Sequence, residues 1–181
     1  VSADSDDEWI GERVNSYDGK RFVTGHGEYV DDINTADMLH AYFVRSEHAS
    51  ARLVDVDTTE AESHPDVELV WTHKDIADRV DEPFGYMLDD EFVLADERVT
   101  YDGQEIAVVL ANSREAAREG AELVDVEYDR GEAVTSLDEA LAEDASLVHP
   151  ELDADPDNHT DGNVAWTGQV HTGDHKDPMA G

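Results

Sequence analysis

The sequence predicts an α+β domain, in which a few short helices pack on a mixed sheet. Residues 106–111 (IAVVLA) are apolar without alternation, which is typical of a strand covered on both faces. Residues 52–57 (RLVDVD) alternate, with Leu53 apart from a face shared by Val54 and Val56, which predicts a strand with one buried face. Residues 113–121 carry the cap and the small side chains of a short helix. Together these three patterns favour strands and helices in one domain.

The centre of the chain gives the clearest order of elements: strand, turn, strand, helix and strand. Asp102-Gly103 predicts a two-residue turn between the arms 98–101 and 106–111, because Gly takes a positive φ without steric cost. An alternating strand resumes at Val124 and Val126. We therefore expect the two arms to form a hairpin, followed by a helix and a further strand.

The helix of this central unit has a predictable start and a predictable buried face. Ser113 is the expected N-cap, because its hydroxyl can accept a hydrogen bond from a backbone N–H of the first turn. Glu115 lies in that turn, where a carboxylate interacts favourably with the helix dipole. Small residues form the face expected to lie on the sheet: Ala116, Ala117, Gly120 and Ala121.

The remaining elements are expected to be short. Further strands are predicted at 38–45, 67–72, 133–134, 145–150 and 163–170, and the apolar residues 92–95 follow a polar loop at 81–90. Helices are predicted at 58–63 with Thr58 or Thr59 as cap, at 74–80 as a helical turn, and at 136–142, where Ser136 and Glu139 form a capping box. Residues 16–33 are rich in glycine and turn residues, and we expect a loop-rich lead-in with these buried contacts: Phe22, Val23, Tyr29 and Val30.

The length bounds the domain organisation. At 181 residues and 20.0 kDa, the chain is long enough for one domain with a substantial core. Residues 1–10 are acidic and poor in apolar side chains, so we expect a mobile N-terminus. Residues 11–150 contain most of the predicted elements and form the expected domain. Residues 151–181 begin with an Asp- and Pro-rich linker.

Charge is the most unusual feature of the composition. The chain has 46 Asp and Glu against 12 Lys and Arg, a formal net charge of −34 at pH 7. Such self-repulsion favours disorder, but 39% of the residues are hydrophobic and fall in periodic segments. We therefore expect a folded domain whose surface is adapted to high salt, where counterions screen the repulsion. The scarcity of basic side chains argues against nucleic acid as a partner, because phosphates require them.

The chain contains no cysteine, which excludes disulfides, thiolate metal sites, iron–sulfur ligation and a cysteine nucleophile within these residues. No apolar run approaches the about 20 residues that span a bilayer, so no membrane span is predicted. The N-terminus is acidic, whereas a secretory signal has a basic start followed by an apolar stretch. We therefore expect a cytoplasmic protein.

No pattern of residues predicts a catalytic, cofactor-binding or metal site in this chain. Gly25-His26-Gly27-Glu28 resembles the start of a phosphate-binding loop, but Val30 occupies the third glycine position and no strand–loop–helix pattern surrounds it. A plain turn is expected there. His171 and His175 have the spacing of a zinc pair on a helix, yet the glycine between them disfavours a helix.

Other candidate groups are equally weak. His149 and His159, with neighbouring acids, could hold a hard cation loosely, but a solvated surface is the simpler interpretation. Acidic pairs such as Asp31-Asp32 and Asp89-Asp90 carry little information in so acidic a chain. Residues 45–48 (RSEH) follow a predicted strand, where functional loops often lie, but a lone histidine there is more often structural. No serine lies in a nucleophile-elbow pattern with His and Asp partners.

Four segments along the chain carry a resemblance to a known family. They are residues 11–33 (GERV, DGKRFVTG and YVDDI), 38–52 (MLHA and VRSEHASAR), 94–109 (LA and VTYDGQEIAVV) and 114–128 (REAA and VDVEY), with a looser continuation at 163–164 and 173–174. In this order they resemble the opening of the molybdopterin-binding large subunit of the xanthine dehydrogenase/aldehyde oxidase family, especially its carbon-monoxide-dehydrogenase-like members. The chain departs from the family at Glu47 and Glu105, where the family usually has Pro, and at Ser113, where it has Thr.

The resemblance implies an α/β-hammerhead domain at 11–150 and, at 151–181, a linker and the truncated start of the molybdopterin-binding domain. It implies a scaffold role in an oxidoreductase that hydroxylates aldehydes or heterocycles, or oxidises carbon monoxide, with water oxygen at a molybdenum centre. Because the family's cofactor-binding and catalytic residues lie downstream, it assigns none to this chain, and the isolated chain is expected to be inactive. The implied partners are the downstream molybdopterin-binding domains and subunits that carry Fe–S clusters and FAD.

Two other functions fit the same residues. A stand-alone hammerhead-like interaction module would expose an apolar patch for its partner. An acidic cation-binding protein would bind cations saturably and at a defined stoichiometry, instead of holding a diffuse ion atmosphere.

Overall fold

The computed structural model describes residue 13 and residues 15–85, 88–153 and 161–166. The chain divides into two units, residues 1–38 and 39–181, and each is described by itself. Within the described residues, no helix is both long enough and apolar enough to cross a membrane.

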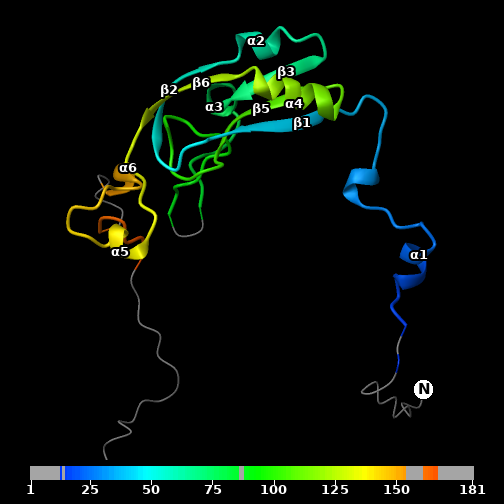
Figure 1. Ribbon diagram of the computed structural model, residues 1–181, viewed down its shortest axis with the longest axis horizontal. Coiled ribbons are helices and arrows are strands. Elements are labelled where there is room, and N and C mark those ends of the chain that lie inside the picture. The colour runs from blue at the N-terminus through cyan, green and yellow to red at the C-terminus, as the bar shows by residue number, and fades with distance from the viewer. Residues whose placement is uncertain (1–12, 14, 86–87, 154–160, 167–181) are drawn as a thin grey trace, which may run out of the picture. The chain divides into compact units, whose positions relative to one another are not determined.

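The N-terminal unit contains two short helical segments, α1 (Gly19–Val23) and the 3-10 helix η1 (Val30–Asp32) (Figure 1). Gly25 turns the chain after α1 with φ of 76°, so the glycine-rich motif begins with the expected plain turn. The predicted buried contacts of this stretch are wrong, since all four are exposed: Phe22, Val23, Tyr29 and Val30. Two single turns provide no second layer among the described residues of this unit, and the rings of Phe22 and Tyr29 stack on each other with centroids 5.8 Å apart.

The larger unit holds two antiparallel sheets of three strands each (Figure 1). The first has the order β1–β5–β3, with bounds His40–Arg45, Glu105–Ala111 and Val67–Thr72. The second has the order β4–β2–β6, with bounds Arg98–Val99, Ala51–Asp57 and Asp125–Arg130. The predicted strands at 38–45, 52–57, 67–72 and 106–111 are therefore confirmed within two residues at each end.

The predicted hairpin around Asp102-Gly103 is wrong in its pairing. Gly103 does turn the chain, with φ of 87°, but β4 pairs with β2, whereas β5 pairs with β1 and β3. The loop after β1 closes the turn instead: Ser46 N–H donates to Gln104 O at 2.8 Å, and Gly103 N–H donates to Ser46 O at 2.9 Å. A local turn signal does not determine with which strands the residues before and after the turn will pair.

A β-bulge in β2 changes which side chains face the core. The register with β6 shifts between Leu53 and Asp55, so that Val54 is the additional residue. Leu53 and Val56 both pack on the core, while 44% of Val54 is exposed. The predicted alternation, with Leu53 apart from a shared Val54 and Val56 face, is wrong because one extra residue reverses the faces beyond it.

The helix α4 (Arg114–Glu122) packs on β1 and β5. Ser113 Oγ accepts a hydrogen bond from Ala116 N–H at 3.1 Å, which confirms the predicted cap. The predicted small face is buried in full: Ala116, Ala117, Gly120 and Ala121. Local patterning was sufficient here, because both the cap and the face are set by residues within one helix.

The strand β5 connects the hydrophobic cores of the two sheets. Val109 packs with Val70 and Ala121 under α4. Ile106, on the same strand, packs with Ala51 and Val99 of the second sheet. This confirms that the apolar run is covered on both faces.

Two short helices flank β3, namely α2 (Thr59–Glu62) and α3 (His73–Ile76). Neither predicted threonine caps α2 through its side chain. Asp57 Oδ1 accepts from Thr59 N–H at 2.9 Å, and hydrogen bonds from the side chain and then the backbone of Thr59 lower the pKa of Asp57. A carboxylate one residue upstream therefore replaces the expected hydroxyl cap.

The region after β6 contains the short helices α5 (Leu137–Ala140) and α6 (Pro150–Asp153). Ser136 Oγ accepts from Glu139 N–H at 3.2 Å, as predicted, but the Glu139 carboxylate accepts from Thr135 N–H at 3.1 Å. Hydrogen bonds from Thr135, first from its backbone, lower the pKa of Glu139. The capping box is therefore confirmed on the serine side, with Thr135 as the other partner.

Three predicted strands are wrong or lie partly outside the described residues. No strand forms at 133–134 or 145–150. Leu94 and Ala95 are buried by side-chain packing without joining a sheet, and Pro150 begins α6 instead of ending a strand. Of the segment 163–170, residues 163–166 form no strand beyond an isolated bridge at Val164, and residues 167–170 lie outside the described part.

Gly120 lies where α4 approaches the sheet most closely. A Cβ atom there would lie 2.6 Å from Val67 Cγ2 and 3.0 Å from Val109 Cγ1, and both atoms belong to stiff, β-branched side chains. We expect Gly120→Ala to destabilise the domain by about 1–3 kcal/mol, although Ala is favoured over Gly in a helix by about 1 kcal/mol. Urea unfolding measures the change, with Glu119→Ala on the exposed side of α4 as control. A stabilised Gly120→Ala variant would contradict this packing.

The cap of α4 gives a smaller expected effect. Ser113→Ala removes the acceptor for Ala116 N–H, and we expect a loss of about 0.5–2 kcal/mol in the free energy of unfolding. Ser113→Asp keeps an acceptor at the same place and should retain most of the stability. Equal losses in both variants would show that the hydroxyl does not act as a cap.

Candidate functional site

A histidine between two acidic side chains forms the most buried cluster of ionisable groups among the described residues. His73, the first residue of α3, places Nδ1 3.2 Å from Glu82 Oε1 and Nε2 3.4 Å from Asp96 Oδ1. Only 3% of the Glu82 side chain is exposed, against 45% of the Asp96 side chain. The ring of Phe92 packs edge-on against the imidazole, with centroids 5.6 Å apart. The cluster is therefore closed on the Glu82 side and open to solvent on the Asp96 side.

This cluster ties α3 to the long connection before β4. Glu82 Oε2 accepts from Val93 N–H at 3.0 Å, so one carboxylate holds both the histidine and the far end of the loop. Neither His73 Nδ1 nor Glu82 Oε1 makes a well-aligned hydrogen bond, although the two atoms lie 3.2 Å apart. The connection pairs with itself at a single bridge, between Phe84 and Glu91.

The cluster lacks the arrangement that proton transfer to a substrate requires. Both ring nitrogens of His73 face carboxylates, so neither is left to take a proton from a substrate or nucleophile. We therefore interpret it as a structural clamp on the loop. Sequence reasoning missed it, since His73, Glu82 and Asp96 have no motif spacing and meet through an irregular connection.

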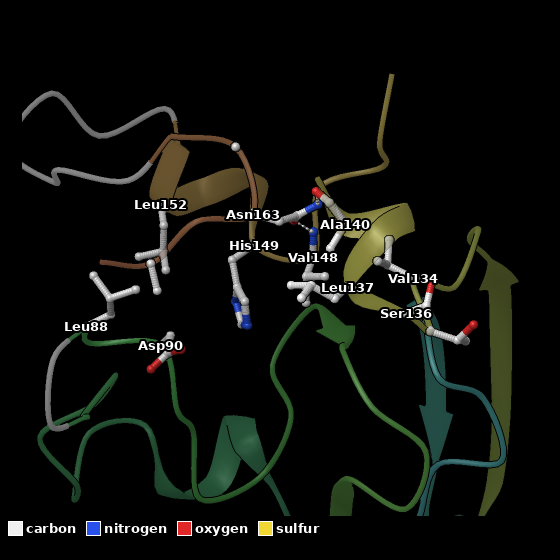
Figure 2. Close-up of a pocket in the computed structure, with 13 residues that line it drawn as sticks. Leu88, Asp90, Val134, Ser136, Leu137, Ala140, Val148, His149, Leu152 and Asn163 are labelled. Atoms are coloured by element: carbon white, nitrogen blue, oxygen red, sulfur yellow. Dashed lines mark hydrogen bonds between the residues drawn. The ribbon is translucent and has the colours of Figure 1, made fainter. Parts of the chain in front are cut away.

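A hollow of about 490 Å³ lies beside α5 and α6 (Figure 2). Figure 2 shows His149 among its lining residues, with Asp90 and Leu88 on the side of the long connection and Leu137 on α5. The imidazole Nδ1 of His149 lies 2.8 Å from Glu151 Oε1, so a carboxylate already engages it. The hollow can hold an apolar group, but its lining provides no set of residues for catalysis.

Asn163 fixes the wall of this hollow. Its amide nitrogen donates to Ala140 O at 3.2 Å and to Ser146 O at 3.0 Å, and its oxygen accepts from Val148 N–H at 2.9 Å. Three backbone groups from α5 and the following loop are thus held by one side chain. A residue predicted to belong to a strand instead organises a loop.

The other candidates from the sequence do not assemble into a site. His159, His171 and His175 lie outside the described residues. Asp31 and Asp32 belong to η1. In the segment 45–48, Arg45 pairs with Glu105 at 2.7 Å, and Ser46 binds the backbone of His48 at 2.8 Å, so these contacts stabilise the end of β1.

The hollow beside α5 and α6 does not fit a molybdenum cofactor. Within residue 13 and residues 15–85, 88–153 and 161–166, no group of three or more His, Asp or Glu side chains could hold a metal ion. The hollow beside α5 and α6 is lined by Asp90 and contains no Lys or Arg, whereas molybdopterin carries a phosphate that requires cationic or N–H donors. No step of a molybdenum reaction is therefore assigned to these residues.

Comparison with known proteins identifies relatives over most of the chain. The family described as "Aldehyde oxidase and xanthine dehydrogenase, a/b hammerhead domain" matches residues 24–132. The carbon monoxide dehydrogenase large chain of Afipia carboxidovorans is 38% identical over 138 residues, which cover 73% of this chain and 16% of that protein. The nicotine 6-hydroxylase large subunit of Paenarthrobacter nicotinovorans is 36% identical over 136 residues, covering 69% of this chain and 16% of that protein.

A solved structure extends the similarity to three dimensions. Reconstituted CO dehydrogenase from Oligotropha carboxidovorans matches with a TM-score of 0.73 at 35% identity, over 78% of this chain and 18% of that chain. The matched region thus spans less than a fifth of the length of each of these three proteins.

Proposed function

Because this chain belongs to the aldehyde oxidase and xanthine dehydrogenase family, through its a/b hammerhead domain, we propose that it is the N-terminal scaffold part of a molybdenum hydroxylase large subunit. The hammerhead fold is the one that the sequence resemblance implied. The observation that carries the proposal is the coverage: the similarity reaches 73% of this chain but 16% of the carbon monoxide dehydrogenase large chain.

The proposal assigns the chemistry to residues outside this chain. The complete protein would hydroxylate an aldehyde or a heterocycle, or oxidise carbon monoxide, with water oxygen at a molybdenum centre held by downstream molybdopterin-binding domains. Electrons would leave through Fe–S and flavin subunits, in the cytoplasm. Residues 11–150 would form the hammerhead scaffold, and residues 151–181 the linker and the first part of the molybdopterin-binding domain.

An activity assay tests this division directly. Purified residues 1–181 are incubated with aldehydes, xanthine or carbon monoxide and a dye acceptor, and we expect no turnover above that of buffer. Extracts of the source cells that contain the complete polypeptide supply the positive control. Turnover by the isolated chain would contradict the assignment of catalysis to downstream residues.

We further propose that the net charge of −34 is an adaptation to high salt. The screening length falls from about 10 Å in 0.1 M salt to about 3 Å in 1 M salt, so repulsion between surface carboxylates weakens steeply over this range. We expect the midpoint of urea unfolding to rise when KCl is increased from about 0.1 M to about 1 M. A near-neutral domain in the same buffers is the control, and an equal or smaller rise for the acidic chain would contradict the adaptation.

A further inference from the structure

A second hollow, of about 560 Å³, runs along one edge of the first sheet. Four consecutive residues of β1, Tyr42–Arg45, line it, together with Glu47. Because consecutive residues of a strand point to opposite faces, a groove that contacts all four runs along the backbone edge. Its opposite wall comes from the end of α4 and the start of β6: Ala121, Glu122, Val124, Asp125, Val126 and Tyr128.

The backbone edge of β1 that borders this groove is unpaired in the described part of the chain. β1 pairs with β5 on one side, and no described strand pairs with its other side. β6 is likewise the outer strand of the second sheet (Figure 1). The free edge of a strand presents N–H and C=O groups, which an extended chain can satisfy by adding a strand.

The two edges differ in their protection against such pairing. β6 carries charges at Asp125, Glu127 and Asp129, which is a common way to keep an edge strand from pairing. β1 has no charged residue and no Pro between its ends His40 and Arg45, and 45% of Tyr42 and 39% of Phe43 are exposed. β1 is therefore the edge suited to accept a strand, and its bulge at Val44/Arg45 limits the length of pairing.

The charges around the groove restrict the kind of segment that can bind. Arg45 is neutralised by Glu105 at 2.7 Å. Within the described residues, Glu47 and Asp125 have no basic partner, so the groove keeps uncompensated negative charge on both walls. A second copy of this chain would bring its own net charge of −34 to the same place, which opposes self-association.

We propose that β1 accepts an extended segment, bearing Lys or Arg beside apolar residues, as a fourth strand of the first sheet. Backbone hydrogen bonds to β1 supply the pairing, Tyr42 and Phe43 contact side chains on opposite faces of the segment, and Glu47 and Asp125 pair with its basic residues. The partner is a polypeptide segment less acidic than this chain. The test uses residues 1–181 alone, so its outcome is distinguishable from that of the activity assay on the proposed function.

A designed peptide tests the proposal on the chain as it exists. The probe is a short acetylated peptide in which Val and Thr alternate with Lys, and the matched control has Glu at each Lys position. Amide hydrogen exchange of residues 1–181 is compared with and without each peptide. We expect the Lys peptide to protect residues 40–45 and to leave β3, the opposite edge of the same sheet, unchanged. The Glu peptide should protect neither edge.

A charge-reversal variant tests whether the two carboxylates select the peptide. Glu47→Lys combined with Asp125→Lys alters two exposed side chains, and we expect it to weaken binding of the Lys peptide about tenfold and to favour the Glu peptide. Circular dichroism checks that the variant is folded. Equal protection of β1 and β3, no protection of β1, or unchanged peptide preference in the variant would each overturn the proposal. Concentration-dependent pairing of β1 between two copies would also overturn it, and would assign the edge to self-association.

Discussion

Replacement of His73 by Ala is expected to lower the free energy of unfolding by about 1–3 kcal/mol, the cost of leaving a buried polar group without its partner. The reason is the environment of Glu82, whose side chain is 3% exposed and faces His73 Nδ1 at 3.2 Å. Without the imidazole, Glu82 Oε1 would lose the only polar ring atom that the described residues place against it in a buried position. Urea unfolding by circular dichroism measures the loss.

A double-mutant cycle separates the loss of this polar contact from simple loss of packing. Glu82→Gln replaces the buried carboxyl group by a neutral amide, so the double variant His73→Ala with Glu82→Gln should be more stable than His73→Ala alone. Asp96→Asn serves as the matched control, because the Asp96 side chain is 45% exposed and its loss should cost much less. A loss below about 1 kcal/mol for His73→Ala, or no recovery in the double variant, would contradict the clamp.

Ile106→Ala is expected to cost about 2–5 kcal/mol, since Ile106 is 1% exposed and truncation leaves a cavity. This side chain belongs to β5 of the first sheet but packs with Ala51 and Val99 of the second. The expected result is therefore a loss for the whole larger unit, with both sheets unfolding in one transition. Two transitions, or a loss confined to the second sheet in hydrogen exchange, would show that the two cores are independent.

Val54→Ala is the control for this prediction. Val54 is the additional residue of the β2 bulge, and 44% of it is exposed. We expect a change within about 0.5 kcal/mol, as for most surface substitutions. Had β2 alternated as the sequence alone predicts, Val54 and Val56 would share one face and their truncation would have similar effects. The comparison of Val54→Ala with Val56→Ala therefore tests the bulge.

What could be predicted from the sequence was set by local chemistry. The cap at Ser113 and the small face of α4 follow from the preferences of a few neighbouring residues, and the structure confirms both. The run 106–111 signalled a strand covered on both faces, and β5 has that position. Recognition of four ordered segments identified the family, which the match over residues 24–132 confirms.

What could not be predicted depends on contacts between distant residues. The predicted turn at Gly103 is confirmed, but its two arms belong to separate sheets. The backbone of Ser46, which is far away in the sequence, makes the hydrogen bonds that close this turn. The bulge at Val54 arises from the register with β6, which no pattern within 52–57 reveals. His73, Glu82 and Asp96 meet through an irregular loop, so their spacing gave no signal. The expected lack of catalytic residues in this chain stays a prediction until activity is measured.

The central claim is that this chain is the scaffold part of a much larger molybdenum hydroxylase subunit. The most direct test is the mass of the native product, detected in the source cells with an antibody raised against residues 1–181, followed by molybdenum analysis of the purified protein. We predict a band several times larger than 20.0 kDa that contains molybdenum. A band at 20.0 kDa without molybdenum would contradict the claim and would favour a stand-alone interaction module.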